Sequence, residues 1–217
     1  MNDKQKGIFI AFEGIDGSGK STQLCRLANK LRKYGLSTYE TFEPTDSPIG
    51  SLIHQIMTGR IKANHETIAA LFVADRIDHI LNDTNGILKK IEDGIIVLSD
   101  RYYFSSYAYH SPHVDMDWVI KANSISSSIL KPDINIFIDL SPEICVERLK
   151  TERMHLELYE NLNSMKQVRI LYFEAIERLK HEENIIIIDG HSSPEEVEKL
   201  IWNNISYLFR SYIKKIN

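Results

Sequence analysis

The sequence predicts an α/β fold in three layers, with a five-stranded parallel sheet between two layers of helices. Five short apolar runs have the length and β-branched composition of buried strands, and they lie at 7–14, 36–43, 95–100, 134–140 and 184–189. Segments with a helical spacing of apolar residues alternate with these runs. Strands that are apolar throughout and alternate with amphipathic helices are typical of a parallel sheet buried on both faces.

The first helix is expected between the first two strands. It follows the run GIFIAFEG at 7–14 and ends at Gly35, a residue type that commonly closes helices. Its buried face is predicted from residues three and four apart, namely Leu24, Leu27, Ala28 and Leu31. The second strand, LSTYETFE at 36–43, is closed by Pro44, which cannot continue a hydrogen-bond ladder.

Helix signals also accompany the last three strands. A long segment of helical character, 66–94, stops at Gly94 and leads into the third strand at 95–100. The fourth and fifth strands are each followed by a serine–proline pair that predicts a helix start, Ser141–Pro142 and Ser193–Pro194. The crossovers between such parallel strands are expected to be right-handed.

Length and composition favour one globular domain over residues 1–217. Of these residues 43% are hydrophobic, and no repeat, low-complexity tract or flexible linker divides the chain. The formal net charge of −4 gives no electrostatic reason to expect nucleic acid or a membrane surface as a partner. Cys25 and Cys145 are far apart and lack metal-ligand spacing, which favours reduced thiols. The apolar run within 1–14 is too short for a secretion signal or membrane span, so we expect a cytoplasmic protein.

Residues 14–21, GIDGSGKS, match the phosphate-loop pattern G-x-x-x-x-G-K-[ST] at every fixed position. The match lies between a predicted strand and a predicted helix, where glycines let backbone N–H groups surround phosphates. Lys20 is then expected to bridge the β- and γ-phosphates of ATP, and Ser21 to ligate Mg²⁺. A glycine-rich turn with a surface lysine is the alternative, and the strand–loop–helix context disfavours it. The residues expected to bind the nucleotide are Gly14, Ile15, Asp16, Gly17, Ser18, Gly19, Lys20, Ser21 and Thr22.

A phosphate loop indicates a fold of the P-loop NTPase type, but kinases, motors and GTPases all share it. No N-K-x-D motif follows a strand, which disfavours a GTPase, and no long second domain is present, which disfavours a motor. Ligands of parallel sheets bind beyond the carboxyl ends of the strands. The sequence places Glu13, Glu43, Asp100 and Asp139 at those ends.

Asp100 and Arg101 directly follow the third strand, next to the expected phosphate loop. An arginine fixed there can fork onto a monophosphate, and the aspartate can hold Mg²⁺ through a water. Alternatively, Asp100 caps a turn and Arg101 is its salt-bridge partner. Glu43, in the segment EPT, also has two interpretations: a strand ended by proline, or a carboxylate at the ligand edge.

Six segments carry a family resemblance over nearly the whole chain. In sequence order they are FIAFEGIDGSGKSTQ, TFEPTDSPIG, LFVADRIDH, DRYYFSSYAYH, LKPDINIFIDL and IDGHSSPEEV. Together, in this order and spacing, they resemble the thymidylate kinases, a far more specific match than the phosphate loop alone. The resemblance implies a five-stranded parallel sheet with helices on both sides and a mobile lid after the fourth strand.

The resemblance also implies where the acceptor nucleotide binds. The loop that begins at Glu43 would lie beside the acceptor phosphate and sugar. Phe72 and Arg76 are four residues apart on a predicted helix and share a face. They correspond to the family residues that stack on thymine and contact its O4. Without the resemblance, Phe72 is more typical of a core position.

Further roles are implied for the segment 100–110. Arg101 corresponds to the arginine that binds the acceptor phosphate. Ser105 and Ser106 lie on the following turn, with the Ser106 position facing the base. Tyr109 would lie under the sugar, where it would crowd a 2′-hydroxyl, and Tyr172 matches a tyrosine near the base. The remaining tyrosines of the segment are expected to be packing residues: Tyr102, Tyr103 and Tyr107.

A lid is expected at about 148–162, within which Arg148 and Arg153 are best placed to reach the transferring phosphate. One branch of the family has an arginine in the phosphate loop and the other has its arginines in the lid. Gly17 is typical of the second branch. The expected catalytic residues are Lys20, Arg101, Asp16, Arg153 and Arg148.

The predicted reaction is transfer of the γ-phosphoryl group of ATP to dTMP, with Mg²⁺, to give dTDP. The first alternative is a deoxynucleoside kinase, in which Glu43 would be the base that a sugar hydroxyl requires. In such enzymes the segment after the third strand resembles Glu-Arg-Ser, whereas this chain has Asp-Arg-Tyr there. The second alternative is a regulatory ATPase without a small acceptor. The resemblance further implies a homodimer, and this chain departs from the family pattern at His110 and Asp78, where glutamine is usual.

Overall fold

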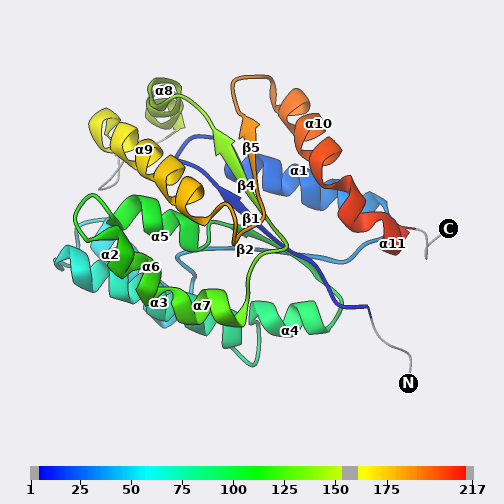
Figure 1. Cartoon of the computed structure of the whole chain (residues 1–217), viewed down its shortest axis with the longest axis horizontal. Helices are drawn as coiled ribbons and strands as arrows, with labels where there is room; N and C mark the ends of the chain where they lie inside the picture. Colours follow the sequence, from blue (N-terminus) through cyan, green and yellow to red (C-terminus); the bar gives the residue numbers. More distant parts are fainter. Residues whose placement is uncertain (1–4, 153–160, 214–217) are drawn as a thin grey trace.

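The computed structural model describes residues 5–152 and 161–213, and a five-stranded sheet forms its centre (Figure 1). The strands are β1 (Phe9–Glu13), β2 (Thr38–Phe42), β3 (Ile96–Asp100), β4 (Ile134–Asp139) and β5 (Ile185–Asp189). Their order is β2-β3-β1-β4-β5, and every neighbouring pair is parallel. Each strand lies within a predicted run, so the predicted fold class is confirmed.

Helices cover both faces of the sheet (Figure 1). One face carries α1 (Lys20–Lys33), α10 (Pro194–Ile205), the 3-10 turn Ser206–Phe209 and α11 (Arg210–Ile213). The other face is covered by α4 (Ile87–Glu92), α5 (Tyr103–His110) and α9 (Leu162–Leu179). The remaining helices are α2 (Pro48–Met57), α3 (His65–Leu81), α6 (Met116–Ala122), α7 (Ser124–Ile129) and α8 (Pro142–Glu152).

The side chains of β1 alternate between two hydrophobic cores. Phe9 and Ala11 pack with the apolar side chains of α5 and α9, whereas Ile10 and Phe12 pack with those of α1 and α10. Successive side chains of a strand point to opposite faces of its sheet. A strand buried on both faces must therefore be apolar at every position, which is the pattern that the sequence displays.

The long helix predicted over 66–94 is wrong as a single element, because the chain forms α3 and α4 with a break between them. Asn82 ends α3 with a ψ of 126°, and its side-chain oxygen accepts from the Thr84 backbone N–H at 3.0 Å. Asparagine side chains compete in this way with the helical hydrogen bonds of the backbone. Gly86 then precedes α4, which ends at Glu92, and a turn at Asp93 and Gly94 leads into β3.

The carboxyl ends of the central strands bring distant segments together. β1 lies between β3 and β4, with Phe12 opposite Asp100 and Glu13 opposite Phe137. On the far side of β3, the Glu43 backbone N–H donates to the Asp100 carbonyl at 3.0 Å. The connections that follow β1, β2 and β3 therefore share one edge of the sheet, as expected for its ligand-binding edge.

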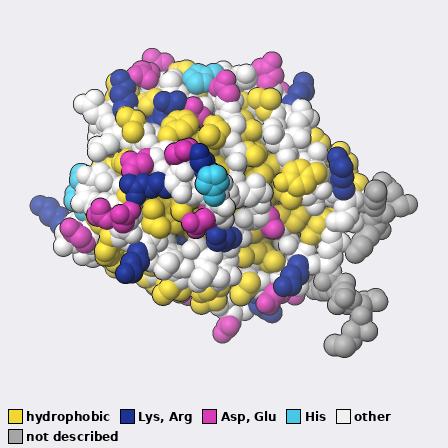
Figure 2. Space-filling model, viewed as in Figure 1, with side chains coloured by type: hydrophobic (Ala, Val, Ile, Leu, Met, Phe, Trp, Pro, Cys, Tyr) yellow, Lys and Arg dark blue, Asp and Glu magenta, His cyan; other side chains and the backbone are white. Residues whose placement is uncertain are grey.

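The surface carries charges of both signs. On the face shown in Figure 2, Lys and Arg side chains are interspersed with Asp and Glu side chains. Arg26 and Lys30 of α1, for example, both contact Glu198 of α10, at 3.0 and 3.2 Å. Within the described ranges, no helix has both the length and the apolar character that crossing a bilayer would require.

Candidate active site at the phosphate loop

The phosphate loop joins β1 to α1 in the predicted strand–loop–helix arrangement. Gly14, Gly17 and Gly19 have φ angles of 144°, 77° and 97°, which residues with a Cβ rarely adopt. A Cβ added at Gly17 would lie 2.8 Å from the backbone oxygen of Cys145, so α8 packs directly against the loop. A side chain at position 17 is therefore disfavoured both by the backbone conformation and by α8. Cys145 is buried and, like Cys25, is a free thiol as predicted.

Polar side chains at the start of α1 converge on the loop. Lys20 is 5% exposed, and its Nζ donates to the Ile15 carbonyl at 3.1 Å. The buried Ser18 hydroxyl has no hydrogen-bond partner in the part of the chain that the structure describes. The Ser21 hydroxyl donates to the Asp100 carboxylate. A hydroxyl and a carboxylate side by side are the hard oxygen ligands that suit Mg²⁺, which keeps waters and substrate phosphates as its other ligands.

Arg101 lies between the phosphate loop and α5. Among the described residues it is the only non-glycine residue with a positive φ, 76°. Such backbone strain costs on the order of 1 kcal/mol and concentrates at functional sites. Its backbone is fixed by a bond from its N–H to the Phe12 carbonyl, 2.8 Å, and by the Ser99 hydroxyl, which donates to its carbonyl at 2.7 Å.

The guanidinium of Arg101 joins the loop, α5 and α9. It donates to oxygen atoms of Gly14 (3.3 Å), Asp16, Ser105 (2.9 Å), Tyr109 (3.1 Å) and Tyr172 (3.3 Å). The structure thus brings together five residues that the sequence assigned to the nucleotide or the acceptor. Their individual roles toward substrates stay predictions.

The Asp16 carboxylate lies close to two cations, Arg101 and Lys20. Burial by itself would raise the pKa of its carboxyl, but Arg101 and Lys20 outweigh burial and lower it to about 2. The Tyr109 hydroxyl donates to the second carboxylate oxygen at 2.8 Å. Burial lowers the pKa of Lys20, and the nearby charge of Arg101 lowers it further. The two cations therefore repel each other, and a phosphate bound between them would relieve that repulsion.

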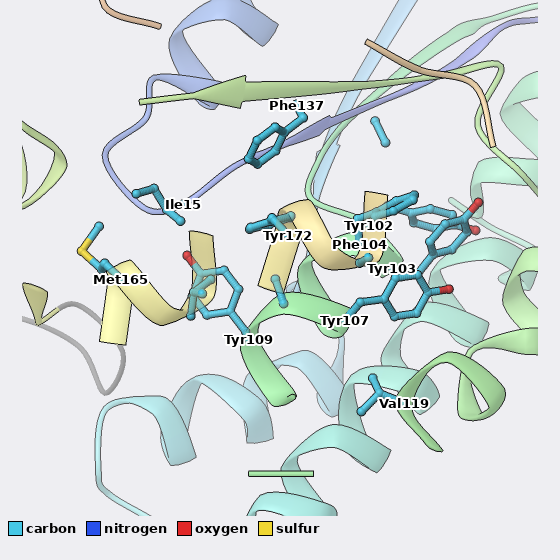
Figure 3. Close-up of a cluster of buried hydrophobic side chains, with 14 of the residues drawn as sticks. Ile15, Tyr102, Tyr103, Phe104, Tyr107, Tyr109, Val119, Phe137, Met165 and Tyr172 are labelled. Atoms are coloured by element: carbon cyan, nitrogen blue, oxygen red, sulfur yellow. The ribbon is translucent and has the colours of Figure 1, made fainter. Parts of the chain in front are cut away.

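The tyrosines of segment 100–110 separate into two groups (Figure 3). Tyr102, Tyr103 and Tyr107 gather in the core, with ring centroids 4.6 and 5.6 Å from Tyr103 to the other two. These three are packing residues, as predicted. Tyr109 lies apart from them and nearer to Ile15 of the loop, and its ring lies 4.7 Å from the guanidinium carbon of Arg101.

Arg76 of α3 is the centre of a second network. Its side chain is 1% exposed, and it contacts the Glu43 carboxylate through Nε at 2.8 Å and Nη2 at 2.6 Å. Nη1 donates to Ser106 at 3.1 Å and to Asn123, and Nη2 donates to the Tyr102 carbonyl at 3.2 Å. Each of the three guanidinium nitrogens is thereby hydrogen-bonded to a protein acceptor. The predicted contact with thymine O4 stays a prediction, and it requires that one of these bonds be exchanged.

Helix α3 also holds the loop that follows β2. The second oxygen of the Glu43 carboxylate lies 3.1 Å from Nδ1 of His79, whose Nε2 lies 2.7 Å from the Thr41 hydroxyl. The Asp75 carboxylate accepts from the backbone N–H and the hydroxyl of Thr45, at 2.8 and 2.6 Å. Both oxygens of the Glu43 carboxylate are therefore held by side chains of α3, one by Arg76 and the other by His79. Sequence reasoning missed Asp75, His79 and the Arg76 partner Asn123. No local pattern in the sequence indicates which distant residues these side chains contact.

Phe72 and His110 lie together at the C-terminal end of α5. Their ring centroids are 4.9 Å apart. His110 is 3% exposed, and burial, reinforced by the charge of Arg76, lowers the pKa of its imidazole to about 3. The imidazole is therefore neutral at physiological pH. The proposed stacking of Phe72 on a base stays a prediction.

The start of the expected lid contacts the phosphate loop. Nη1 of Arg148 donates to the Gly17 carbonyl at 3.2 Å. Arg153, the second predicted lid arginine, lies outside the described residues. C-terminal to the expected lid in the sequence, Arg169 of α9 forms a bidentate ion pair with Asp139 at the tip of β4, at 2.6 and 2.8 Å.

A cavity of about 920 Å³ opens at this edge of the sheet. The phosphate loop, the first turns of α1, the tip of β2, Asp100, Arg101 and Arg148 line it. The connection from β5 to α10 also contributes Gly190, Ser192 and Pro194, which sequence reasoning did not assign. The position of this connection, directly beyond the carboxyl end of the fifth strand, could have indicated that these residues line the site.

The parallel sheet and the phosphate loop after β1 define the class, a P-loop nucleotide-binding protein. Comparison with known families then identifies the family within this class. The sequence model of the family described as thymidylate kinase matches residues 12–201. The chain belongs to the thymidylate kinase family.

Curated relatives agree over most of the chain. It is 36% identical over 202 residues to a probable thymidylate kinase of Methanocaldococcus jannaschii, covering 93% of this chain and 95% of the relative. A probable thymidylate kinase of Pyrobaculum aerophilum is 37% identical over 190 residues, with 87% and 91% covered. The thymidylate kinase of Leptospira borgpetersenii is 33% identical over 193 residues, with 89% and 90% covered.

Proposed function

We propose that this chain is an enzyme that transfers the γ-phosphoryl group of ATP to dTMP and thereby produces dTDP. The observation that carries the proposal is the position of Arg101, which adjoins the phosphate loop and contacts Asp16 and Tyr109. A guanidinium there supports a monophosphate acceptor, because its forked N–H groups match two phosphate oxygens. Membership of the thymidylate kinase family supports thymine as the base.

The chemistry needs alignment and charge neutralisation rather than a base. The acceptor oxygen of a monophosphate is already ionised at neutral pH, so no group has to remove a proton from it. Lys20 neutralises the β- and γ-phosphates, and Arg101 holds the acceptor phosphate in line. Arg148, which already contacts the Gly17 carbonyl, and Arg153 neutralise the transferring group.

Ser21 and Asp100 are the residues that we propose for Mg²⁺, Ser21 as a direct ligand and Asp100 through a water. Their hydrogen bond supports this assignment, because it brings a hydroxyl and a carboxylate together beside Lys20. When bound, Mg²⁺ would offset the negative charge of the phosphate oxygens during transfer.

The nucleoside part of dTMP is proposed to lie along α5. Tyr109, beside Arg101, would lie under the sugar, with Ser105 and Tyr172 behind it. Phe72, which contacts His110 next to Tyr109 at the C-terminal end of the helix, would stack on the base, and the Arg76–Ser106 pair would lie near its edge. The Glu43 loop would border the phosphate and sugar.

A deoxynucleoside kinase is the weaker candidate, because it needs a free carboxylate to take a proton from a sugar hydroxyl. Both oxygens of the Glu43 carboxylate are held, one by Arg76 and the other by His79. A regulatory ATPase without a small acceptor gains no support from any described feature.

We further propose a single domain over 1–217, a lid at about 148–162, a homodimer and a cytoplasmic location. Family membership supports the lid and the dimer. Light scattering tests the dimer directly. A particle of twice the chain mass of 25.1 kDa is expected, and a particle of the single mass would reject it.

A coupled assay of ADP release tests the proposed activity. The wild-type chain is given ATP and Mg²⁺ with dTMP, dUMP, thymidine or no acceptor. We expect rapid release with dTMP and none above background with thymidine. Rapid release with thymidine would favour the nucleoside kinase, and equal release without an acceptor would favour an ATPase.

A further inference from the structure

A buried carboxylate lies directly behind the Arg101 network and has no role in the mechanism above. Glu13 is the last residue of β1, immediately before the phosphate loop, and is 1% exposed. Buried carboxylates are costly unless they are hydrogen-bonded or paired with a charge. The groups that surround Glu13 therefore indicate what its charge is for.

Three donors from neighbouring elements converge on Glu13. The Tyr102 backbone N–H, at the start of α5, donates to Oε1 at 2.9 Å. The Ser105 hydroxyl of α5 donates to Oε2 at 2.6 Å, and the Tyr172 hydroxyl of α9 donates to the same oxygen at 3.1 Å. The carboxylate thus fixes two hydroxyl groups from different helices.

The same two hydroxyl groups are acceptors for Arg101. Nη1 of Arg101 lies 2.9 Å from Ser105 Oγ and 3.3 Å from Tyr172 Oη. A hydroxyl has one hydrogen, and the hydrogen determines which side of the oxygen presents lone pairs. Ser105 and Tyr172 also lie 2.8 Å apart, and the Gly14 carbonyl lies 3.3 Å from the Tyr172 hydroxyl, so Glu13, Ser105 and Gly14 are all acceptors within reach of the tyrosine hydrogen. When the tyrosine hydrogen points to Glu13 or to Ser105, the hydrogens of both hydroxyls are directed toward the carboxylate, and their lone pairs face the guanidinium.

We infer that Glu13 is a positioning residue, whose ionised carboxylate orients the Ser105 and Tyr172 hydroxyls so that both accept from Arg101. The guanidinium is then held in one orientation before the acceptor phosphate arrives. A protonated or amide side chain would donate a hydrogen to one of the two hydroxyls and turn its hydrogen toward Arg101. The inference rests on the proposed function, because it concerns the arginine assigned to the acceptor phosphate.

The ionisation of Glu13 makes this arrangement sensitive to pH. Burial raises the pKa of its carboxyl to about 7, although the hydrogen bonds and the charge of Arg101 act in the opposite direction. The charged or titratable groups around it are Arg101 and Lys20, with the phenols of Tyr172 and Tyr107. The orientation of Arg101 should therefore weaken as the pH falls below about 7.

Steady-state kinetics of Glu13→Gln test the inference. The KM for dTMP is expected to rise roughly ten- to a hundredfold, the value of one charge-assisted hydrogen bond, while the KM for ATP stays within about twofold. The acidic limb of kcat/KM for dTMP should also become shallower than in the wild type. The ionisation of dTMP itself is common to both proteins and cancels in this comparison.

Two further variants keep the test interpretable. Glu13→Asp retains the charge with a shorter reach, so it should recover part of the affinity and the acidic limb. If Glu13→Gln does not fold, Glu13→Asp carries the test alone, with a selective rise in the KM for dTMP expected. Glu183→Gln is the matched control, because Glu183 accepts from the Tyr103 hydroxyl of the same helix at 2.7 Å but does not contact Arg101.

A wild-type KM for dTMP in Glu13→Gln, or equal increases in both KM values, would overturn the inference. So would a Glu13→Asp variant that is indistinguishable from Glu13→Gln, or one that leaves the KM for dTMP unchanged. Failure of the proposed function is recognised separately. In that case the wild-type chain itself would release no additional ADP when dTMP is supplied.

Discussion

Arg101 and Arg76 are both paired with a carboxylate at the same edge of the sheet, yet their surroundings differ. The Arg76 side chain is 1% exposed, and each of its three guanidinium nitrogens is hydrogen-bonded to a protein acceptor. The Arg101 side chain is 15% exposed and lines the cavity, and its Nε has no acceptor within the described ranges. One arginine is thus enclosed in the framework, and the other remains open to a ligand.

The difference shows that an arginine at a ligand edge is not by itself a ligand-binding residue. The Arg76 network joins α3 to α5 and to the loop after β2, so its loss should cost stability. The Arg101 network joins the phosphate loop to α5 and α9 around a strained backbone, so its loss should cost activity. Substitutions at the two positions separate a loss of stability from a loss of activity.

Substitution of Arg101 by alanine is expected to have the largest effect. The kcat/KM for dTMP should fall on the order of a thousandfold, because the charge that binds the acceptor phosphate is lost. The KM for ATP should change little, as measured by ADP release with both substrates varied. Arg26→Ala is a suitable control, because Arg26 pairs with Glu198 on the surface and should retain wild-type rates. Normal turnover of dTMP by Arg101→Ala would contradict the assignment of Arg101 to the acceptor phosphate.

Substitution of Arg76 by methionine should chiefly lower stability. Loss of the guanidinium leaves Glu43 buried without its charged partner, which costs about 3 kcal/mol of unfolding free energy. Urea denaturation measures this loss, and Arg101→Ala should lose clearly less. The double variant Arg76→Met with Glu43→Gln should regain part of the stability. Equal losses in Arg76→Met and Arg101→Ala would contradict the contrast between the two arginines.

The carboxylate partner of Arg101 should give a pH-dependent effect. The pKa of Asp16 is lowered from 3.8 to about 2 in the folded protein. Its contribution is therefore fully present above pH 3.8 and lost as the pH falls through about 2. Asp16→Asn should cost about 2 kcal/mol of unfolding free energy at pH 7 and about half of that at pH 3.

Unfolding curves of Asp16→Asn at the two pH values check this sign. Glu177→Gln provides the control, because Glu177 is exposed and pairs only with Lys180 in the described structure. It should show no measurable difference at either pH. A loss in Asp16→Asn that grew toward low pH would be inconsistent with a carboxylate stabilised by Arg101.

The smallest effect is expected when a glycine with a positive φ angle is replaced by alanine. Gly17 and Gly59 have nearly identical φ angles, 77° and 76°, but a Cβ at Gly59 meets no atom within 4 Å. Gly59→Ala should therefore cost about 1 kcal/mol for the backbone conformation alone. Gly17→Ala should cost more, because its Cβ also approaches the Cys145 oxygen, and thermal unfolding measures the difference. Equal costs would show that α8 does not restrict the loop.

The sheet and the phosphate loop were predictable because their signals are local. Continuous apolar runs define the five strands to within about two residues, and the loop motif follows β1 directly. The break at Asn82 was missed because one side chain outweighed a helical pattern on both sides of it.

The site networks could not be predicted from local pattern. Glu13 meets Tyr172 across 159 positions, and Arg76 meets Asn123 across 47. Only the order of the strands and the packing of α5 between α3 and α9 bring these residues together. For the same reason the sequence did not distinguish the enclosed Arg76 from the open Arg101.

Product analysis with ATP labelled in its γ-phosphoryl group tests the central claim most directly. The wild-type chain is incubated with labelled ATP, Mg²⁺ and dTMP, and the products are separated by chromatography. We predict that the label appears in dTDP in amounts equal to the ADP formed. Label that appears only in inorganic phosphate, or no transfer to dTMP at all, would contradict the account.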